Sequence, residues 1–261
     1  MNIMKVLKKN KIYTGVGSRS TPLDQQNILT SLSKKLSSYG YTLRSGHAEG
    51  ADMAFEKGTR RRRVYAPWEG FNGFSGDIAE FTDDVYNFTA GEFEEHQKDG
   101  VYWKNIRDST KKLMIRNVFQ VIGHDFKNPV PSDFLMCWAD VNEGEVQGGT
   151  GFTVHLAKKF DIPVFNINDP EDLKNSKILL TCIKYDYRIT LIRQLMWFHY
   201  SDLDSESQNI LDEFQNIEYI KETDEYKNYF DLYPLLTKDF TVLVNYLFKK
   251  HRDILLKDNG N

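Results

Sequence analysis

The sequence is poor in cysteine and contains no long apolar segment. Its two cysteines, Cys137 and Cys182, are too few for a disulfide framework, and each lies in an apolar run, so we expect buried thiols in a reducing cytosol. No apolar run approaches the roughly 18 residues that a membrane span needs. Residues 1–11 lack the apolar core and the cleavage site of a secretory signal, which predicts a cytoplasmic protein without a membrane partner.

The chain also lacks a strong excess of charge of either sign. Its 34 Lys and Arg residues against 37 Asp and Glu residues give a formal net charge of −3, so the chain as a whole has no general attraction for nucleic acid. One dense basic run, Arg60–Arg63, is the local exception. It is interpreted either as a solvated loop that enters a strand or as a phosphate or nucleic-acid contact.

Strand-like and helix-like segments alternate over the first 168 residues. The predicted strands are 12–16, 41–43, 62–66, 133–139 and 163–167, and the predicted helices are 23–39, 51–57, 104–121 and 152–160. This alternation predicts an α/β fold, a Rossmann-like doubly wound parallel sheet.

The composition changes in two places along the chain. Residues 74–100 are acidic and aromatic and are interpreted as an insertion over one edge of the sheet. Glycine nearly disappears after residue 168, and apolar residues there recur at helical spacing. We therefore expect a Rossmann-like domain over residues 1–168 and a mostly helical C-terminal region over residues 169–261.

Three glycine-bearing turns each follow a predicted strand. Because the carboxyl ends of parallel strands meet at one edge of a sheet, the three turns can surround one ligand. Glycine allows close backbone approach, and N–H groups at a helix start, hydroxyl groups and an arginine all bind phosphate. The alternative for each turn is a tight connection without a ligand. The phosphate-binding candidates in these turns are Gly15, Gly17, Ser18, Arg19, Ser45, Gly46, His47, Gly148, Gly149, Thr150 and Gly151.

Other side chains are candidates for contacts with the remaining parts of a ligand. Arg116 and Asn117 fall off the apolar stripe of the predicted helix 104–121, so we expect them to contact phosphate or sugar. Trp68 and Phe71 follow the third strand and are candidates for stacking on a base, although a place in the core or at its rim fits equally well. His47 is either a phosphate donor or an exposed turn residue. No Cys/His cluster has metal-ligand spacing, so neither a metal nor a cofactor is predicted.

Three carboxylates lie on or beside the second turn. Asp52 and Glu56 are four residues apart and share a helix face, and Glu49 precedes them. Carboxylates beside an anomeric carbon can act as nucleophile or general base, which makes Asp52 and Glu49 the catalytic candidates for cleavage of an N-glycosidic bond. The alternative is that Asp52 braces the turn while Glu56 faces water.

Eight short stretches resemble the SLOG superfamily, which includes the DprA/Smf proteins and the LOG-type phosphoribohydrolases. In chain order they are TGVGSRSTP, LRSGHAEGADMAFEKG, VYAPW, FNG, MIRN, DFLMCWAD, GGTG and IPVFN. The resemblance is strongest to stand-alone DprA-like proteins of phages and bacteria and covers residues 11–168. It implies a Rossmann-type domain that binds a nucleotide or a nucleotide derivative.

The two branches of the superfamily imply different activities. In LOG-type enzymes the pattern PGGxGTxxE holds phosphate, and its Glu acts with an upstream Arg on the base–ribose bond. Here Gly148, Gly149 and Gly151 match the glycines and Arg116 partly matches the Arg, but His155 or a neighbour stands where the Glu is expected. The DprA likeness implies binding of single-stranded DNA.

The favoured hypothesis is a protein that binds a phosphorylated nucleotide-type ligand as a sensor or by sequestering it. The missing Glu weighs against a LOG-type hydrolase. A nucleotide N-glycosidase that uses Asp52 or Glu49 as its catalytic carboxylate is the second hypothesis. A single-stranded DNA-binding protein of DprA type is the third hypothesis. Because SLOG proteins often dimerise, we expect a homo-oligomer.

Overall fold

The computed structural model describes most of the chain and divides it into two compact units, residues 1–180 and 181–261, each treated by itself. The described residues are 10–76, 78, 81–97, 100–199 (side chains up to 184), 201, 203–209, 211–212, 246–247 and 249–251. The predicted domain boundary at residue 168 precedes the long helix α6 (Pro170–His199), in which the division between the units falls.

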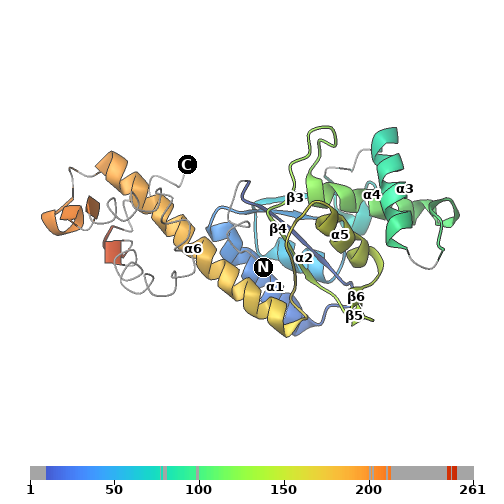
Figure 1. Ribbon diagram of the computed structural model, residues 1–261, viewed down its shortest axis with the longest axis horizontal. Helices are drawn as coiled ribbons and strands as arrows, with labels where there is room; N and C mark the ends of the chain where they lie inside the picture. The colour runs from blue at the N-terminus through green and yellow to red at the C-terminus, as the bar shows by residue number, and fades with distance from the viewer. Residues whose placement is uncertain are drawn as a thin grey trace, which may run out of the picture. The chain divides into compact units, whose positions relative to one another are not determined.

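A five-stranded, wholly parallel sheet forms the centre of the first unit (Figure 1). Its order is β3-β2-β1-β4-β7, which confirms the predicted Rossmann-like α/β fold. In the central register, Tyr13 of the first strand lies between Leu43 and Phe134 of its two neighbours. The strands are β1 (Ile12–Gly17), β2 (Thr42–Ser45), β3 (Arg62–Val64), β4 (Phe134–Trp138) and β7 (Val164–Asn166).

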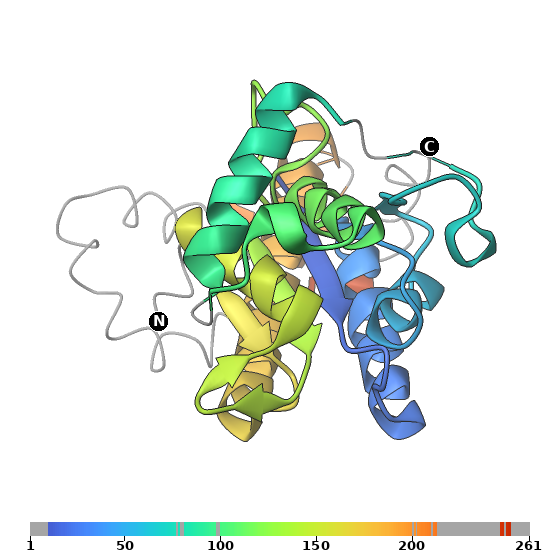
Figure 2. The same cartoon turned by 90° about the vertical axis from the view of Figure 1, so that its right-hand side faces the viewer.

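Helices cover both faces of this sheet (Figures 1 and 2). The helices α1 (Leu23–Ser38) and α2 (Ala51–Lys57) pack together beside β1 and β2. The helices α4 (Asp108–Ile122) and α5 (Gly148–Lys159) pack together across β4 and β2. Right-handed crossovers that run in both directions from β1 require such a division between the two faces.

The expectation of an insertion over one edge of the sheet holds only at its start, where Ile78 bridges Ala66 beyond the edge strand β3. Residues 83–96 form α3 (Asp83–His96), which packs on the outside of α4 and α5 (Figure 2). The reason is apolar burial, because Val85 and Phe93 of α3 join Trp103 and Phe152 in the same hydrophobic core. Two 3₁₀ turns flank this segment, η2 (Phe71–Gly73) and η3 (Trp103–Asn105).

The start of α5 also differs from the expectation. The stretch Gly148–Gly151, predicted as a loop, forms the first turn of the helix. A small antiparallel hairpin, β5 (Val141–Asn142) and β6 (Glu145–Val146), precedes it. Glu143 and Gly144 have φ angles of 51° and 80°, as the tight turn of a two-residue hairpin requires.

Strand β4 is buried on both faces, as its continuous apolar run predicts. On one face Phe134 stacks on Tyr13, with ring centroids 5.6 Å apart. On the other face Leu135 and Cys137 join the cluster formed by α4 and α5. Burial raises the pKa of the Cys137 thiol to about 12, so this cysteine stays protonated and inert at neutral pH.

Few of the C-terminal predictions can be placed. Of the three stretches with helical spacing, residues 189–196 lie within α6, whereas residues 210–214 and 240–247 lie largely outside the described residues. Ser207 and His251 share a hydrogen bond of 2.9 Å within the second unit. Across the described residues, no helix is long and apolar enough to cross a membrane.

We predict that Gly15→Ala destabilises the sheet. The added Cβ would lie 2.7 Å from Leu43 Cδ1 and 2.8 Å from Phe55 Cγ, so the free energy of unfolding should fall by about 1–3 kcal/mol in urea denaturation. Gly91→Ala is the control, because a Cβ there enters open space in the interior of α3 and should raise stability by up to about 1 kcal/mol. Equal stabilities of the two variants would contradict this packing.

Candidate functional site

The chain order around the sheet creates a crevice between β1 and β4. The chain leaves β1 toward β2 and β3 and then returns to the other side of β1 as β4, and ligands of open α/β sheets bind at such a switch point. A cavity of about 470 Å³ opens there, beyond the carboxyl ends of both strands. Its lining is Val16, Gly17, Ser18, Arg19, Ala48, Asp52, Leu113, Met114, Arg116, Asn117, Gln120, Ala139, Asp140, Gln147, Gly148, Gly149, Thr150 and Thr153.

The first turn, after β1, is fixed to its neighbours through its backbone. The Ser18 N–H donates to Trp138 O at 2.8 Å, and Ser18 O accepts from the N–H groups of Thr21 and Ala51. Gly50 has a φ of 79°, and a Cβ at that position would overlap Ser18 O. The turn is therefore held closely against the start of α2, which leaves Ser18 and the exposed Arg19 on the cavity wall.

The third turn brings the N-terminus of α5 to the cavity. The Gly151 N–H donates to Gln147 O at 3.1 Å, so the N–H groups before it precede the first intrahelical bond. Asn117 of α4 donates its amide to Gly149 O at 3.0 Å and fixes this turn against α4. A Cβ on Gly151 would overlap Val146 O of the hairpin. The positive end of the α5 dipole thus lies at the cavity.

The Asp52 carboxylate connects the first two turns to α4. One oxygen accepts from the Gly17 N–H at 3.1 Å, and the other accepts from the Gly46 N–H at 3.2 Å and from Arg116 Nη1 at 3.3 Å. Gln120 adds a longer contact of 3.5 Å from its amide. A Cβ on Gly46 would overlap the Arg116 guanidinium, so glycine is required where this ion pair passes the second turn.

Burial dominates the electrostatics of this pair. Asp52 is 3% exposed, and desolvation raises its pKa to about 6 although Arg116 lowers it. Desolvation likewise lowers the pKa of Arg116, opposed by the charge of Asp52. The carboxylate is therefore held at a cost in solvation that its hydrogen bonds to two backbone N–H groups offset in part.

A second buried carboxylate supports the second turn from within. Glu56 is 3% exposed and accepts from the His47 N–H at 2.9 Å, and its other oxygen lies 2.7 Å from His47 Nδ1. The expectation that Glu56 faces water is therefore wrong. His47 takes a φ of 55° to make both contacts, and the Asn72 amide donates to His47 O at 2.9 Å.

The structure brings most of the predicted site residues together. Nine of them line the cavity: Gly17, Ser18, Arg19, Asp52, Arg116, Asn117, Gly148, Gly149 and Thr150. The others lie outside the lining. Gly15 packs against Leu43 and Phe55, Ser45 is a buried residue of β2, and a Cβ on Gly46 or Gly151 would overlap neighbouring atoms. His47 contacts Glu56, and Glu49 is exposed.

Phe71 lies beside Arg116, Trp68 lies beside Phe71, and neither ring lines the cavity. Phe71 is buried, and the Arg116 guanidinium carbon lies 5.9 Å from the centre of its ring. Trp68 meets Phe71 edge to face with 5.0 Å between ring centroids. In this arrangement the two aromatic rings support the position of Arg116.

Sequence reasoning found Arg116 and Asn117 on α4 but missed the other lining residues of this helix and the residues that follow β4. On α4, Leu113, Arg116, Asn117 and Gln120 follow the spacing i, i+3, i+4, i+7 of one helix face, which would have identified Leu113 and Gln120. The other missed residues are Val16, Ala48, Met114, Ala139, Asp140, Gln147 and Thr153. Ala139 and Asp140 directly follow β4, so their place at the carboxyl edge was within reach of the same argument.

Comparisons with known proteins give one match to report. No protein-family model matches the chain, and no curated protein matches it. A solved structure similar to this chain is that of DNA processing protein A from Helicobacter pylori, which was described for its mode of binding single-stranded DNA. The two are 18% identical, with 70% of this chain and 84% of that chain covered and a TM-score of 0.41.

We predict that Asp52 makes stability depend on pH. Between its usual pKa of 3.8 and its folded pKa of about 6, the folded state binds more protons than the unfolded state. The contribution of Asp52 to stability therefore falls as the pH rises through this window. The advantage in unfolding free energy of the wild type over the non-titrating Asp52→Asn should fall by about 2 kcal/mol from pH 4 to pH 7 in urea denaturation. An advantage that grows with pH would contradict the raised pKa.

Proposed function

We propose that the chain binds a phosphorylated nucleotide, or a ligand derived from one, in the cavity between β1 and β4, as a sensor or by sequestering it. The observation that carries the proposal is the meeting of the N-terminus of α5 with Arg19 and Ser18 on one cavity at the switch point of the sheet. N–H groups that lack intrahelical acceptors, a guanidinium and a hydroxyl are all donors that suit a phosphate.

The other walls of the cavity fit the sugar and the base. Asp140 lies on the lining directly after β4, and a carboxylate at the edge of a Rossmann-type sheet is suited to accept from ribose hydroxyl groups. Val16, Leu113 and Met114 give an apolar wall. An apolar wall with a few directed polar groups is typical of sites for small ligands.

Binding is favoured over cleavage of the base–sugar bond by the positions of the two catalytic candidates. Both oxygens of Asp52 are engaged by backbone and side-chain donors, and Glu49 lies outside the cavity lining. A carboxylate in such a network supports the walls of the site, which is the bracing role considered from the sequence. N-glycosidase activity remains the enzymatic alternative, and released base is its product.

We expect Arg19→Ala to weaken binding of nucleoside monophosphates about tenfold, as the loss of one charge-assisted hydrogen bond predicts. Affinity would be measured by calorimetry, and the ligand would be checked by chromatography afterwards. Arg19 is exposed, so its removal should leave folding intact. Arg60→Ala is the matched control, because it removes another exposed arginine that is outside the cavity lining.

Each outcome of this experiment separates the hypotheses. Ligand that binds and returns intact supports a sensor or sequestering protein. Free base in the products, lost in Asp52→Asn, would show an N-glycosidase. Equal affinities for the wild type and Arg19→Ala, or no binding of any nucleotide tested, would contradict the proposal.

Single-stranded DNA is the second candidate ligand, and the observation that favours it is the basic run at β3. Arg60–Arg63 are all exposed and lead into the edge strand of the sheet. Arg62 is held in place by donation to Glu56 O at 2.7 Å. These residues lie at the start of β3, and so at the amino end of the parallel strands, whereas the cavity lies at the carboxyl end.

We expect replacement of Arg60, Arg61 and Arg63 by alanine to abolish binding of an oligothymidylate if this second candidate is correct. Arg62 is left in place because of its backbone contacts. Fluorescence anisotropy of the labelled oligonucleotide at several salt concentrations measures the effect, since contacts to phosphate weaken steeply with salt. No binding by the wild type at low salt would eliminate the DNA candidate and leave the nucleotide proposal standing.

A further inference from the structure

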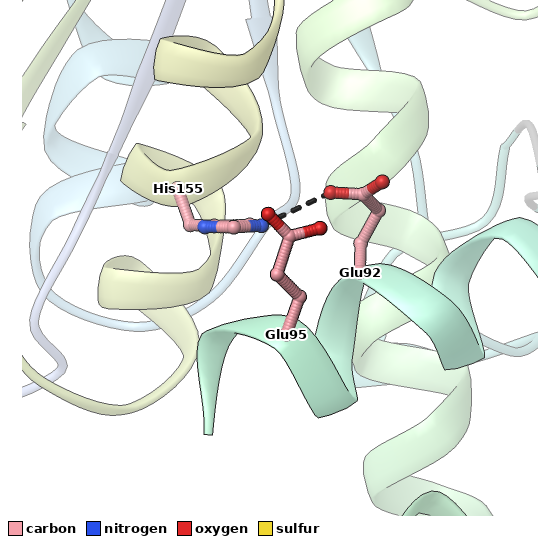
Figure 3. Close-up of side chains that lie close together, drawn as sticks. All are labelled: Glu92, Glu95 and His155. Atoms are coloured by element: carbon pink, nitrogen blue, oxygen red, sulfur yellow. Dashed lines mark hydrogen bonds and ion pairs between the residues drawn. The ribbon is translucent and has the colours of Figure 1, made fainter. Parts of the chain in front are cut away.

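Two helices far apart in the sequence bring three metal-ligating side chains together outside the cavity. Glu92 and Glu95 come from α3 and His155 comes from α5, and the three point toward one another (Figure 3). One ligand atom from each lies within 4.8 Å of the others. Glu92 Oε2 is 3.0 Å from His155 Nε2. None of the three lines the cavity.

The charges of this cluster already call for a cation. Lys159 Nζ lies 2.9 Å from Glu92 Oε1 and 3.2 Å from Glu95 Oε2, so its ammonium occupies the position between the two carboxylates. The two carboxylates thus share one ammonium. Glu92 is buried, which makes uncompensated negative charge costly. A divalent ion in place of the ammonium would neutralise both carboxylates.

The competing ammonium is able to leave. The Lys159 side chain is 44% exposed, so its flexible stem can turn into solvent without opening the core. A second imidazole, that of His96 at the end of α3, lies beside His155 with 5.3 Å between the ring centroids. The Nε2 of His96 faces Gly151, so the protein ligands of the cluster are the three side chains alone, and water would complete the coordination of a bound ion.

We propose that Glu92, Glu95 and His155 bind a divalent transition-metal ion, with Zn²⁺ as the best fit, and that this ion fastens α3 to α5. Mixed imidazole and carboxylate ligands without a thiolate suit Zn²⁺, whereas Mg²⁺ takes oxygen ligands and keeps several waters. The position between two helices fits a structural role. The first turn of α5 forms part of the cavity, so the ion would also stiffen that wall.

The test is calorimetric titration of the purified, metal-stripped full chain with ZnCl₂, and with MgCl₂ as the comparison ion. We expect Zn²⁺ to bind with one ion per chain and Mg²⁺ to bind much more weakly. Glu95→Gln and His155→Gln should each lower the Zn²⁺ affinity about tenfold or more. Glu95 is exposed, so Glu95→Gln keeps the test valid even if a change at His155 impairs folding.

Lys159→Ala separates a metal site from an ordinary ion-pair cluster. Removal of the competing ammonium should raise the Zn²⁺ affinity several-fold. If the cluster serves only as an ion pair with Lys159, the same change should lower stability without raising the Zn²⁺ affinity. Lys111→Ala removes another lysine that contacts a carboxylate, and His124→Ala removes an exposed histidine, so both should leave the affinity unchanged.

Three results would overturn the proposal. The first is the absence of Zn²⁺ binding by the wild type. The second is Zn²⁺ binding that Glu95→Gln and His155→Gln leave unchanged, which would mean that the ion binds elsewhere on the surface. The third is an unchanged or lower affinity in Lys159→Ala.

Discussion

The buried carboxylate of Asp52 is the interaction on which the candidate site depends. It accepts hydrogen bonds from the backbone of two turns, at Gly17 and Gly46, and it pairs with Arg116 of α4. These three segments are far apart in the sequence, and their positions relative to one another define one side of the cavity. Because the carboxylate is buried and its pKa is raised, the arrangement is held at a cost in solvation.

The α5 wall of the cavity presents backbone groups, and the Asp140 carboxylate lies on the lining after β4. There the first turn of α5 presents N–H groups, and Asn117 and the backbone at Val146 hold that turn through Gly149 and Gly151. The site thus combines a fixed ion pair, which is itself neutral overall, with a helix dipole and the exposed Arg19. The donors of α5 and of the first turn meet at this cavity, whose lining also includes the Asp140 carboxylate, and we propose that a phosphate binds to these donors.

Local sequence rules predicted the elements whose ends are set by local chemistry. The bounds of α2 were correct because Gly50 and Gly58 flank an unbroken helical pattern. The start of α5 was not, since glycines favour a loop locally and only tertiary contacts at Gly149 and Gly151 make them helical. Glu56 was misjudged because its partner, His47, reaches it only through a positive φ. The cluster of Glu92 and His155 depends on the packing of α3 against α5, which no local pattern contains.

A crystal structure of the protein soaked with a nucleoside monophosphate would locate the bound nucleotide. We expect the phosphate in the cavity, within hydrogen-bond distance of the N–H groups of Gly149 or Thr150, with the Arg19 guanidinium beside it. We also expect Asp52 to keep its contacts with Gly17, Gly46 and Arg116. A nucleotide found elsewhere, for example at Arg60–Arg63, with the cavity free of ligand, would contradict the proposed site.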